Sequence, residues 1–176
     1  MGVRDEYSKY GVDKYYLEYG NEYKNPHFNT IRELIQNEVI KGKVLDLACG
    51  NGEATICLDS SKVSVVGCDP YLNNQYIVNT HNQCYSYNFD DIIDGRLSDL
   101  EFDVIVCSFA MHLCEESKLD VLLYQLSLIT KELIILTPNK KPDIKDTFWD
   151  IKYEKVLDRV RLRRYQSKIK IYEQNA

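Results

Sequence analysis

The sequence predicts an α/β fold, with one mostly parallel seven-stranded sheet, helices on both faces and an antiparallel hairpin at the C-terminal end. Two observations predict it. Short apolar runs, typical of strands buried on both faces, alternate along the chain with segments of helical periodicity. This alternation is typical of parallel strands joined by right-handed crossovers. The last two strand-like segments instead alternate apolar and polar residues around a tight turn, which predicts an antiparallel pair.

The predicted elements follow in order along the chain. The first is a helix, because Asn25 is a favoured N-cap, Pro26 is favoured at the first helical position and Gly42 is a favoured stop. Its apolar face comprises Phe28, Ile31, Leu34, Ile35 and Val39. Apolar runs predict strands at 44–47, 63–67, 83–88, 102–107 and 133–136, and helices are expected to start at 53–58 and to span 119–130. A hairpin at 148–157 and 160–167, turning at 158–159, completes the sheet.

Composition indicates a single globular domain. The chain has 176 residues, of which 44% are hydrophobic and 28% charged, enough to bury a sizeable core. We expect one domain over 1–176, with a tyrosine-rich lid segment at 1–25 and the sheet-bearing core at 26–176. The polar start and the lack of a long apolar run predict a cytoplasmic protein without a membrane span. The net charge of −5 argues against broad nucleic-acid binding.

The six cysteines form no Cys-x-x-Cys pair and mostly fall within strand-like segments. This pattern predicts reduced, buried thiols rather than a disulfide framework or a zinc site. We therefore expect no bound metal.

The most informative stretch is the glycine turn that follows the first predicted strand. Ala48, Gly50 and Gly52 place small residues at alternate positions, where a ligand can approach the backbone closely. Asp46 lies inside the apolar run, and a polar ligand or a cluster of N–H donors would explain it. The N–H groups of a helix beginning at Glu53 would favour an anionic group at the turn. A tight strand-to-helix turn without any ligand is the alternative.

Asp69 follows the second predicted strand, where an acidic side chain holds a ribose diol in nucleotide-binding α/β folds. A carboxylate that accepts hydrogen bonds from both ribose hydroxyls forms charge-assisted bonds, which are stronger than neutral ones. A helix N-cap before Pro70 is the alternative role of Asp69, and the two roles are compatible.

Each terminal segment allows two interpretations. The N-terminal tyrosines at near-helical spacing are Tyr15, Tyr16, Tyr19 and Tyr23. They predict an aromatic helix face that packs on the domain or closes over a site as a lid. The C-terminal basic residues are Arg161, Arg163, Arg164, Lys168 and Lys170. They predict a solvated sheet edge protected by positive charge, with an RNA-binding stripe as the alternative.

These motifs together resemble those of the class I S-adenosylmethionine (SAM)-dependent methyltransferases. The stretch from Val44 to Gly52 is similar to the family's first motif, with Ala48 in place of its first glycine. Further similarities are Asp69 after the second strand, Asn88-Phe89-Asp90 at the adenine-contacting turn, Phe102-Asp103 at the fourth-strand motif, and the reversed terminal hairpin. The resemblance covers 26–168 and implies a Rossmann-like sheet. Thr55 stands where a dinucleotide-binding fingerprint has its third glycine, which argues against an NAD-dependent dehydrogenase.

The resemblance implies SAM as cofactor and S-adenosylhomocysteine (SAH) as product. It places the methionine part of the cofactor against Asp46, Ala48, Cys49, Gly50 and Gly52. It places the ribose and adenine against Asp69, Pro70, Tyr71, Asn88, Phe89 and Asp90, and the methyl donor beside Cys107 and Ser108. Either Asn88 or Asp90 would receive the exocyclic amine of adenine.

The acceptor is less constrained. His112 is the candidate general base, because the pKa of histidine lies naturally near neutrality, and a packing or capping role is the alternative. The residues expected to surround the acceptor are Tyr16, Tyr19, Tyr23, His27 and Phe109. No Asn-Pro-Pro-Tyr sequence follows the fourth strand, and this favours a small-molecule acceptor. The alternatives are a protein or RNA methyltransferase that docks through the basic hairpin, and a non-catalytic, cofactor-binding partner subunit.

Overall fold

A computed structural model of the chain describes residues 24–170. Its sheet contains β1 (Gly42–Leu47), β2 (Val63–Cys68), β3 (Cys84–Tyr85), β4 (Phe102–Ser108), β5 (Thr130–Thr137), β6 (Trp149–Leu157) and β7 (Val160–Ser167). The helices are α3 (Phe28–Gln36), α4 (Asn73–Thr80), α5 (Phe89–Ile93) and α6 (Glu116–Ile129), with 3-10 turns η2 (Thr55–Cys57) and η3 (Met111–Leu113).

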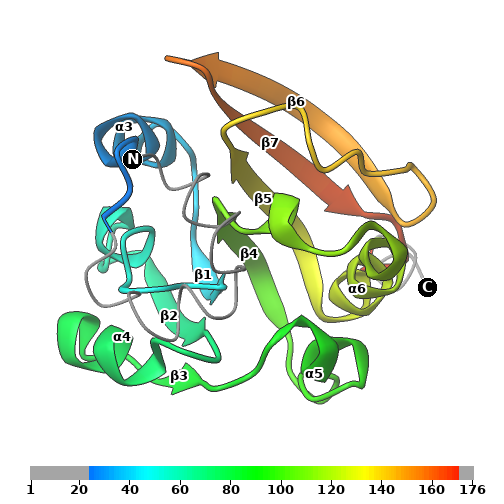
Figure 1. Ribbon diagram of the computed structural model, residues 1–176, viewed down its shortest axis with the longest axis horizontal. Coiled ribbons are helices and arrows are strands. Elements are labelled where there is room, and N and C mark those ends of the chain that lie inside the picture. Colours follow the sequence, from blue (N-terminus) through cyan, green and yellow to red (C-terminus); the bar gives the residue numbers. More distant parts are fainter. Residues whose placement is uncertain (1–23, 171–176) are drawn as a thin grey trace, which may run out of the picture.

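The strand order is β3-β2-β1-β4-β5-β7-β6. Parallel pairing joins β1 to both β2 and β4, β2 to β3 and β4 to β5, whereas β7 pairs antiparallel with both β5 and β6. The chain therefore extends the sheet from β1 through β2 to β3 on one side, and from β4 through β5 to the hairpin on the other. Open α/β sheets bind ligands at such a switch point, outside the carboxyl ends of their strands. Figure 1 shows the β6–β7 hairpin on the outer side of β5. The predicted fold class, with its antiparallel end, is confirmed.

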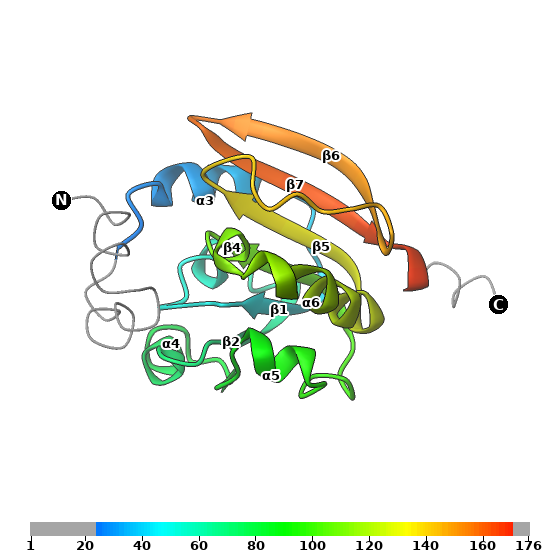
Figure 2. The ribbon, with the colours of Figure 1, turned by 45° about the vertical axis from the view of Figure 1, so that its right-hand side comes forward.

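Helices cover both faces of the sheet (Figures 1 and 2). The inner strands alternate, so that Leu45 and Leu47 of β1 face the cluster that contains α5 and α6, whereas Val44 faces the cluster that contains α3 and η2. The same alternation holds along β4 and β5. Asp46 shares the side of β1 that carries Val44, and this geometry directs its carboxylate toward η2.

The first helix is shorter than predicted. It begins at Phe28, because Asn25 uses its side-chain oxygen to accept the N–H of His27 at 2.8 Å in a turn that precedes the helix. It ends at Gln36, and Val39, which was expected on the buried face, is 75% exposed. Gly42 does not stop the helix but opens β1 with a φ of 89°.

Other boundaries also differ from the sequence predictions. The third strand is confined to Cys84–Tyr85, and the helix expected from 53 is only the 3-10 turn η2. Helices α4 and α5 were not predicted, because Asn73–Thr80 is rich in asparagine and threonine, which are weak helix formers, and α5 is only five residues long. The hairpin is confirmed, and both of its turn residues have positive φ, 46° at Asp158 and 66° at Arg159.

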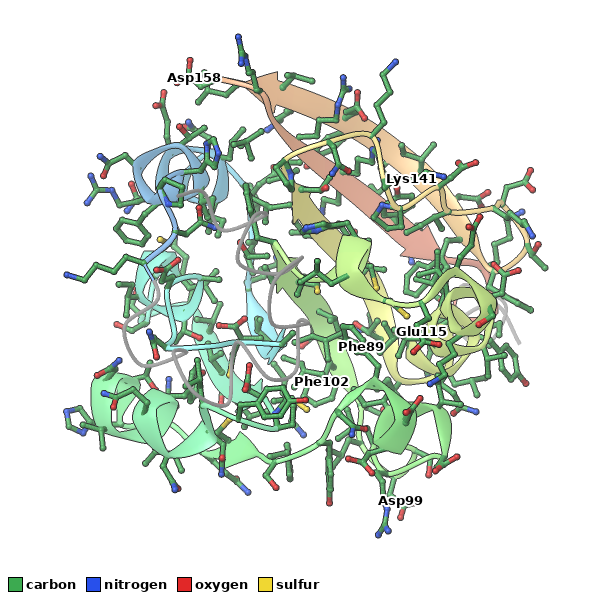
Figure 3. The ribbon with its side chains drawn as sticks, viewed as in Figure 1. Phe89, Asp99, Phe102, Glu115, Lys141 and Asp158 are labelled. Carbon is green, nitrogen blue, oxygen red and sulfur yellow. The ribbon has the colours of Figure 1, made fainter. Side chains whose placement is uncertain are left out.

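The basic residues of the hairpin are not a solvated stripe. Arg163 and Arg164 are buried on β7, which is an interior strand, and they pair with Glu154 and Glu132. Further pairs join Arg161 to Glu154, Lys168 to Asp150 and Lys170 to Glu101. The prediction of a solvated, positively charged edge is therefore wrong for the two arginines, which are buried and pair with carboxylates of the neighbouring strands β5 and β6. Figure 3 places Asp158, at the tip of the hairpin, far from Phe89.

All six cysteines carry free thiols, which confirms that they form no disulfide framework. Four of them are buried, including Cys107 in the core. Between residues 24 and 170, no helix is long and apolar enough to cross a membrane.

Candidate active site

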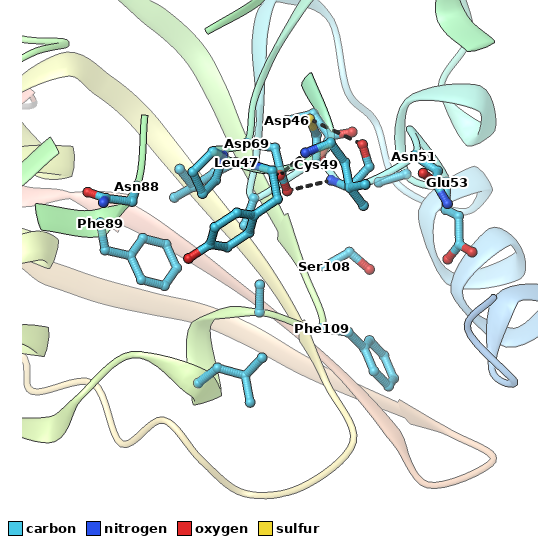
Figure 4. A pocket seen from close by; sticks show the side chains of 18 of the residues that line it. Asp46, Leu47, Cys49, Asn51, Glu53, Asp69, Asn88, Phe89, Ser108 and Phe109 are labelled. Carbon is cyan, nitrogen blue, oxygen red and sulfur yellow. Dashed lines mark hydrogen bonds between the residues drawn. The ribbon is translucent and has the colours of Figure 1, made fainter. Parts of the chain in front are cut away.

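A cavity opens at the carboxyl ends of β1, β2 and β4, at the switch point of the sheet. From the glycine turn and its flanks, Asp46, Leu47, Ala48, Cys49, Gly50, Asn51, Glu53 and Ala54 line it. The other lining residues are Asn25, Asp69, Pro70, Tyr71, Leu72, Tyr87, Asn88, Phe89, Ser108, Phe109, Ala110 and Leu113. Figure 4 shows Asp69 between Phe89 on one side and Glu53 on the other.

The two glycines of the turn serve different purposes. Both have positive φ, 54° at Gly50 and 94° at Gly52, and Ala48 adopts 53° although it carries a Cβ. A Cβ on Gly50 would meet no atom within 4 Å, so this position leaves room on the cavity side. A Cβ on Gly52 would lie 2.5 Å from the Thr80 side chain of α4. Gly52 does not line the cavity and packs closely against α4, and its contact with the cofactor stays a prediction.

Asp46 is held from within the protein. Its Oδ2 accepts the Thr55 hydroxyl at 2.7 Å and the Thr55 N–H at 3.2 Å, and the Thr55 hydroxyl also contacts the Tyr76 hydroxyl at 2.8 Å. Thr55 of η2 therefore supplies the hydrogen-bond donors that a carboxylate inside the apolar run was expected to need. The carboxylate is 1% exposed, and burial raises the pKa of Asp46 to about 7.

Asp69 connects the turns that follow β1 and β2. Its Oδ2 accepts the N–H of Gly50 at 3.0 Å, and its Oδ1 accepts the N–H groups of Tyr71 and Leu72 at 2.8 Å each. Helix α4 begins later, at Asn73, so Asp69 caps the preceding turn rather than the helix itself. Because Oδ1 already accepts two N–H groups and Oδ2 accepts one, the acceptor capacity that Asp69 retains is the second lone pair of Oδ2.

A capping box at the start of α5 gives Asn88 and Asp90 different surroundings. The Asn88 side chain accepts the N–H of Asp91 at 2.9 Å, and Asp91 accepts the N–H of Asn88 at 3.0 Å. Asp90 points away, toward Lys118 of α6 at 2.9 Å, and does not line the cavity. Of the two candidates for the adenine contact, Asn88 therefore lines the cavity, together with Phe89, and Asp90 does not.

Two other predicted site residues, at the end of β4, face opposite sides of the strand. Cys107 is fully buried in the core beneath the cavity and does not line it, and its place beside the methyl donor stays a prediction. Burial also raises the pKa of the Cys107 thiol. Ser108 does line the cavity, because successive side chains of a strand point to opposite faces.

The predicted acceptor residues are brought together only in part. Phe109 lines the cavity with a φ of 56°, and its ring lies 5.5 Å from the ring of His27 and 6.5 Å, edge to face, from the ring of His112. Neither histidine lines the cavity, and the contact of His112 with the acceptor stays a prediction beside the observed contact of its ring with Phe109. The predicted lid residues Tyr16, Tyr19 and Tyr23 lie outside the described residues.

Sequence reasoning missed several cavity residues. Glu53 follows the glycine turn directly and was interpreted only as the start of a helix, and Tyr87 precedes the predicted adenine turn. Their adjacency to recognised motifs was the available signal. Asn25 carried no such signal, because only the fold brings it to the glycine turn, where its N–H reaches Glu53 Oε1 at 3.2 Å.

Comparison with known proteins identifies this architecture. Residues 44–132, just over half of the chain, match the model of a family described as a methyltransferase domain. This chain belongs to that family. The matched region runs from β1 into β5 and thus contains the glycine turn, Asp69 and the end of β4. The resemblance to the class I SAM-dependent methyltransferases is confirmed, and the chain is a methyltransferase domain.

Individual relatives are similar over most of their length. An uncharacterized protein of Schizosaccharomyces pombe is 29% identical, over 94% of this chain and 92% of its own. Magnesium protoporphyrin IX methyltransferase of Synechocystis, solved with bound SAM, is 15% identical with a TM-score of 0.61, covering 94% of this chain and 95% of that one. A TehB-like SAM-dependent methyltransferase of Corynebacterium glutamicum is 14% identical with a TM-score of 0.63, covering 93% and 97%. At this identity, the solved structures establish a shared fold.

Proposed function

We propose that this methyltransferase binds SAM across the cavity and transfers its methyl group to a small molecule. The observation that carries the proposal is the bridge from Asp69 to the N–H of Gly50, because it fixes a carboxylate next to a backbone position that leaves open space. Adenine would lie beside Asn88 and Phe89, a ribose hydroxyl would donate to Asp69 Oδ2, and the methionine part would pass over Gly50.

The residues present fit this cofactor in polarity as well as in arrangement. A hydrogen bond from a ribose hydroxyl to Asp69 would be charge-assisted, and Phe89 and Tyr71 offer apolar surface for the purine. When bound, the sulfonium of SAM supplies an electrophilic methyl group. The protein then has to align a nucleophile about 3 Å from that carbon and to exclude competing water.

The acceptor would enter beside the end of β4. Ser108, Phe109, Ala110 and Leu113 line that part of the cavity, and apolar walls with few polar groups are typical of small-molecule sites. The ion pairs of the β6–β7 hairpin count against docking of RNA there, because each basic residue singled out from the sequence already contacts a carboxylate. A small acceptor is therefore the better-supported alternative.

Calorimetric titration with SAM and SAH tests the cofactor site, and transfer of radiolabelled methyl groups to a pool of small metabolites tests the activity. We expect both nucleosides to bind and label to appear in a small product. Label that enters only protein or RNA would overturn the small-molecule acceptor, and the absence of heat with both nucleosides would overturn the cofactor site.

A further inference from the structure

The cavity has an unbalanced charge. Its lining includes three acidic side chains, Asp46, Glu53 and Asp69, of which Asp46 has a pKa raised by burial to about 7, whereas none of the lining residues in the described part of the chain is a lysine, arginine or histidine. A small, partly closed site of this kind attracts cations and repels anions, because charges interact more strongly where water is excluded.

Two of these carboxylates are already committed to the protein. Asp46 accepts the hydroxyl and N–H of Thr55, and Asp69 accepts three backbone N–H groups. Glu53 differs, because the hydrogen bond recorded for its carboxylate comes from the N–H of Asn25 and reaches Oε1, which leaves Oε2 to face other groups. Burial raises the pKa of Glu53, as expected for an acid whose charge lacks a cationic partner.

The position of Glu53 assigns it to the acceptor end. Figure 4 shows Glu53 beyond Asn51, on the side of the cavity opposite Asn88 and Phe89 and on the same side as Ser108 and Phe109. An adenine placed at Phe89 and a ribose placed at Asp69 would leave this side for the acceptor. The bond from Asn25 fixes the Glu53 side chain there, because Asn25 is itself buried and held before α3.

We propose that Glu53 determines acceptor specificity by pairing with a cationic nitrogen, so that the acceptor is a small molecule that carries an ammonium or amidinium group. The proposal rests on the proposed function, since it takes the other end of the cavity as the adenosine site. An ammonium that donates to Glu53 would form a charge-assisted hydrogen bond, and the apolar wall of Phe109, Ala110 and Leu113 would cover the rest of the molecule. A carboxylate or phosphate acceptor would face like charge and be excluded.

Benzylamine, benzyl alcohol and benzoate have similar shapes and different charges. Titrating each of them into the protein saturated with SAH tests the role of Glu53. We expect benzylamine to bind at least tenfold more tightly than the other two. The preference should shrink below threefold in Glu53→Gln, which removes the charge but keeps the acceptor for Asn25, and should persist in Glu53→Asp. Glu33→Gln, on the exposed side of α3, is the matched control and should change nothing.

The outcomes separate this proposal from the proposed function. Equal responses of the wild-type protein to the three probes, including no response, overturn the role of Glu53 while SAH binding keeps the cofactor site intact. A tenfold loss of SAH affinity in Glu53→Gln overturns it too, because Glu53 would then belong to the cofactor. Failure of the wild-type protein to bind SAH at all would overturn the cofactor site first, and the acceptor assignment with it.

Discussion

Asp69 accepts the backbone N–H of Gly50 at 3.0 Å, and this bond spans the carboxyl ends of the neighbouring strands β1 and β2. The remaining oxygen of Asp69 orders the turn before α4. A single carboxylate thus shapes both turns at the proposed cofactor site, and its loss should change binding and local order together.

Asp69→Ala should lower SAH affinity by about 1.5–3 kcal/mol, the size of a hydrogen bond to a charged group. Calorimetry measures this directly. The matched control is Asp99→Asn, because Asp99 is exposed and lies away from the cavity (Figure 3). Unchanged SAH binding in Asp69→Ala would remove Asp69 from the ribose site.

Substitution of the two glycines by alanine should separate binding from stability. Gly50→Ala should abolish measurable SAH binding with a loss of only about 1 kcal/mol of unfolding free energy, because its Cβ would enter open cavity space and the cost is that of a positive φ. Gly52→Ala should cost more stability, about 2 kcal/mol or more, since its Cβ would collide with Thr80 and approach Tyr76. Urea unfolding and calorimetry on both variants check the pair, and the reverse order of stabilities would contradict it.

Asp46 should make stability fall as pH rises. Its pKa in the folded protein is about 7, above the ordinary value of 3.8, so the fold favours the neutral acid. The stabilisation is complete below about pH 4 and is lost as the pH rises through 7, by at most about 1.4 kcal/mol per pH unit. The unfolding free energy of the wild-type protein, relative to Asp46→Asn, should therefore decrease between pH 4 and pH 7. A difference that stays flat, or that increases over this range, would show that the carboxyl group is ionised in the fold.

Two substitutions of His112 distinguish support of Phe109 from proton transfer. Because His112 contacts the Phe109 ring and does not line the cavity, His112→Phe should keep turnover within about threefold, whereas His112→Ala should lower it by tenfold or more. SAH affinity should stay within twofold in both. A comparable loss of turnover in the two variants would instead make the imidazole a general base.

Local signals in the sequence predicted the strands and the hairpin turn well. The apolar runs of β1, β4 and β5 require burial on both faces, and only a tight turn fits Asp158 and Arg159 between two alternating segments. The glycine turn and Asp69 were likewise visible, because their chemistry depends on residues close together in the chain.

Contacts between distant segments could not be predicted. The direction of Asp90 depends on Lys118 of α6, and the cavity position of Glu53 depends on Asn25, 28 residues away. The charges of Arg163 and Arg164 suggested a solvated edge, and only their acidic partners on neighbouring strands reveal that they are internal.

The position of β7 between β5 and β6 has a consequence for biosynthesis. A ribosome makes every cavity residue before it reaches Val160, and until β7 emerges the edge of β5 has no antiparallel neighbour. Nascent chains would therefore carry an open, apolar sheet edge from the synthesis of Thr137 until Ser167 is made, a state in which unfinished α/β proteins recruit chaperones or associate with one another.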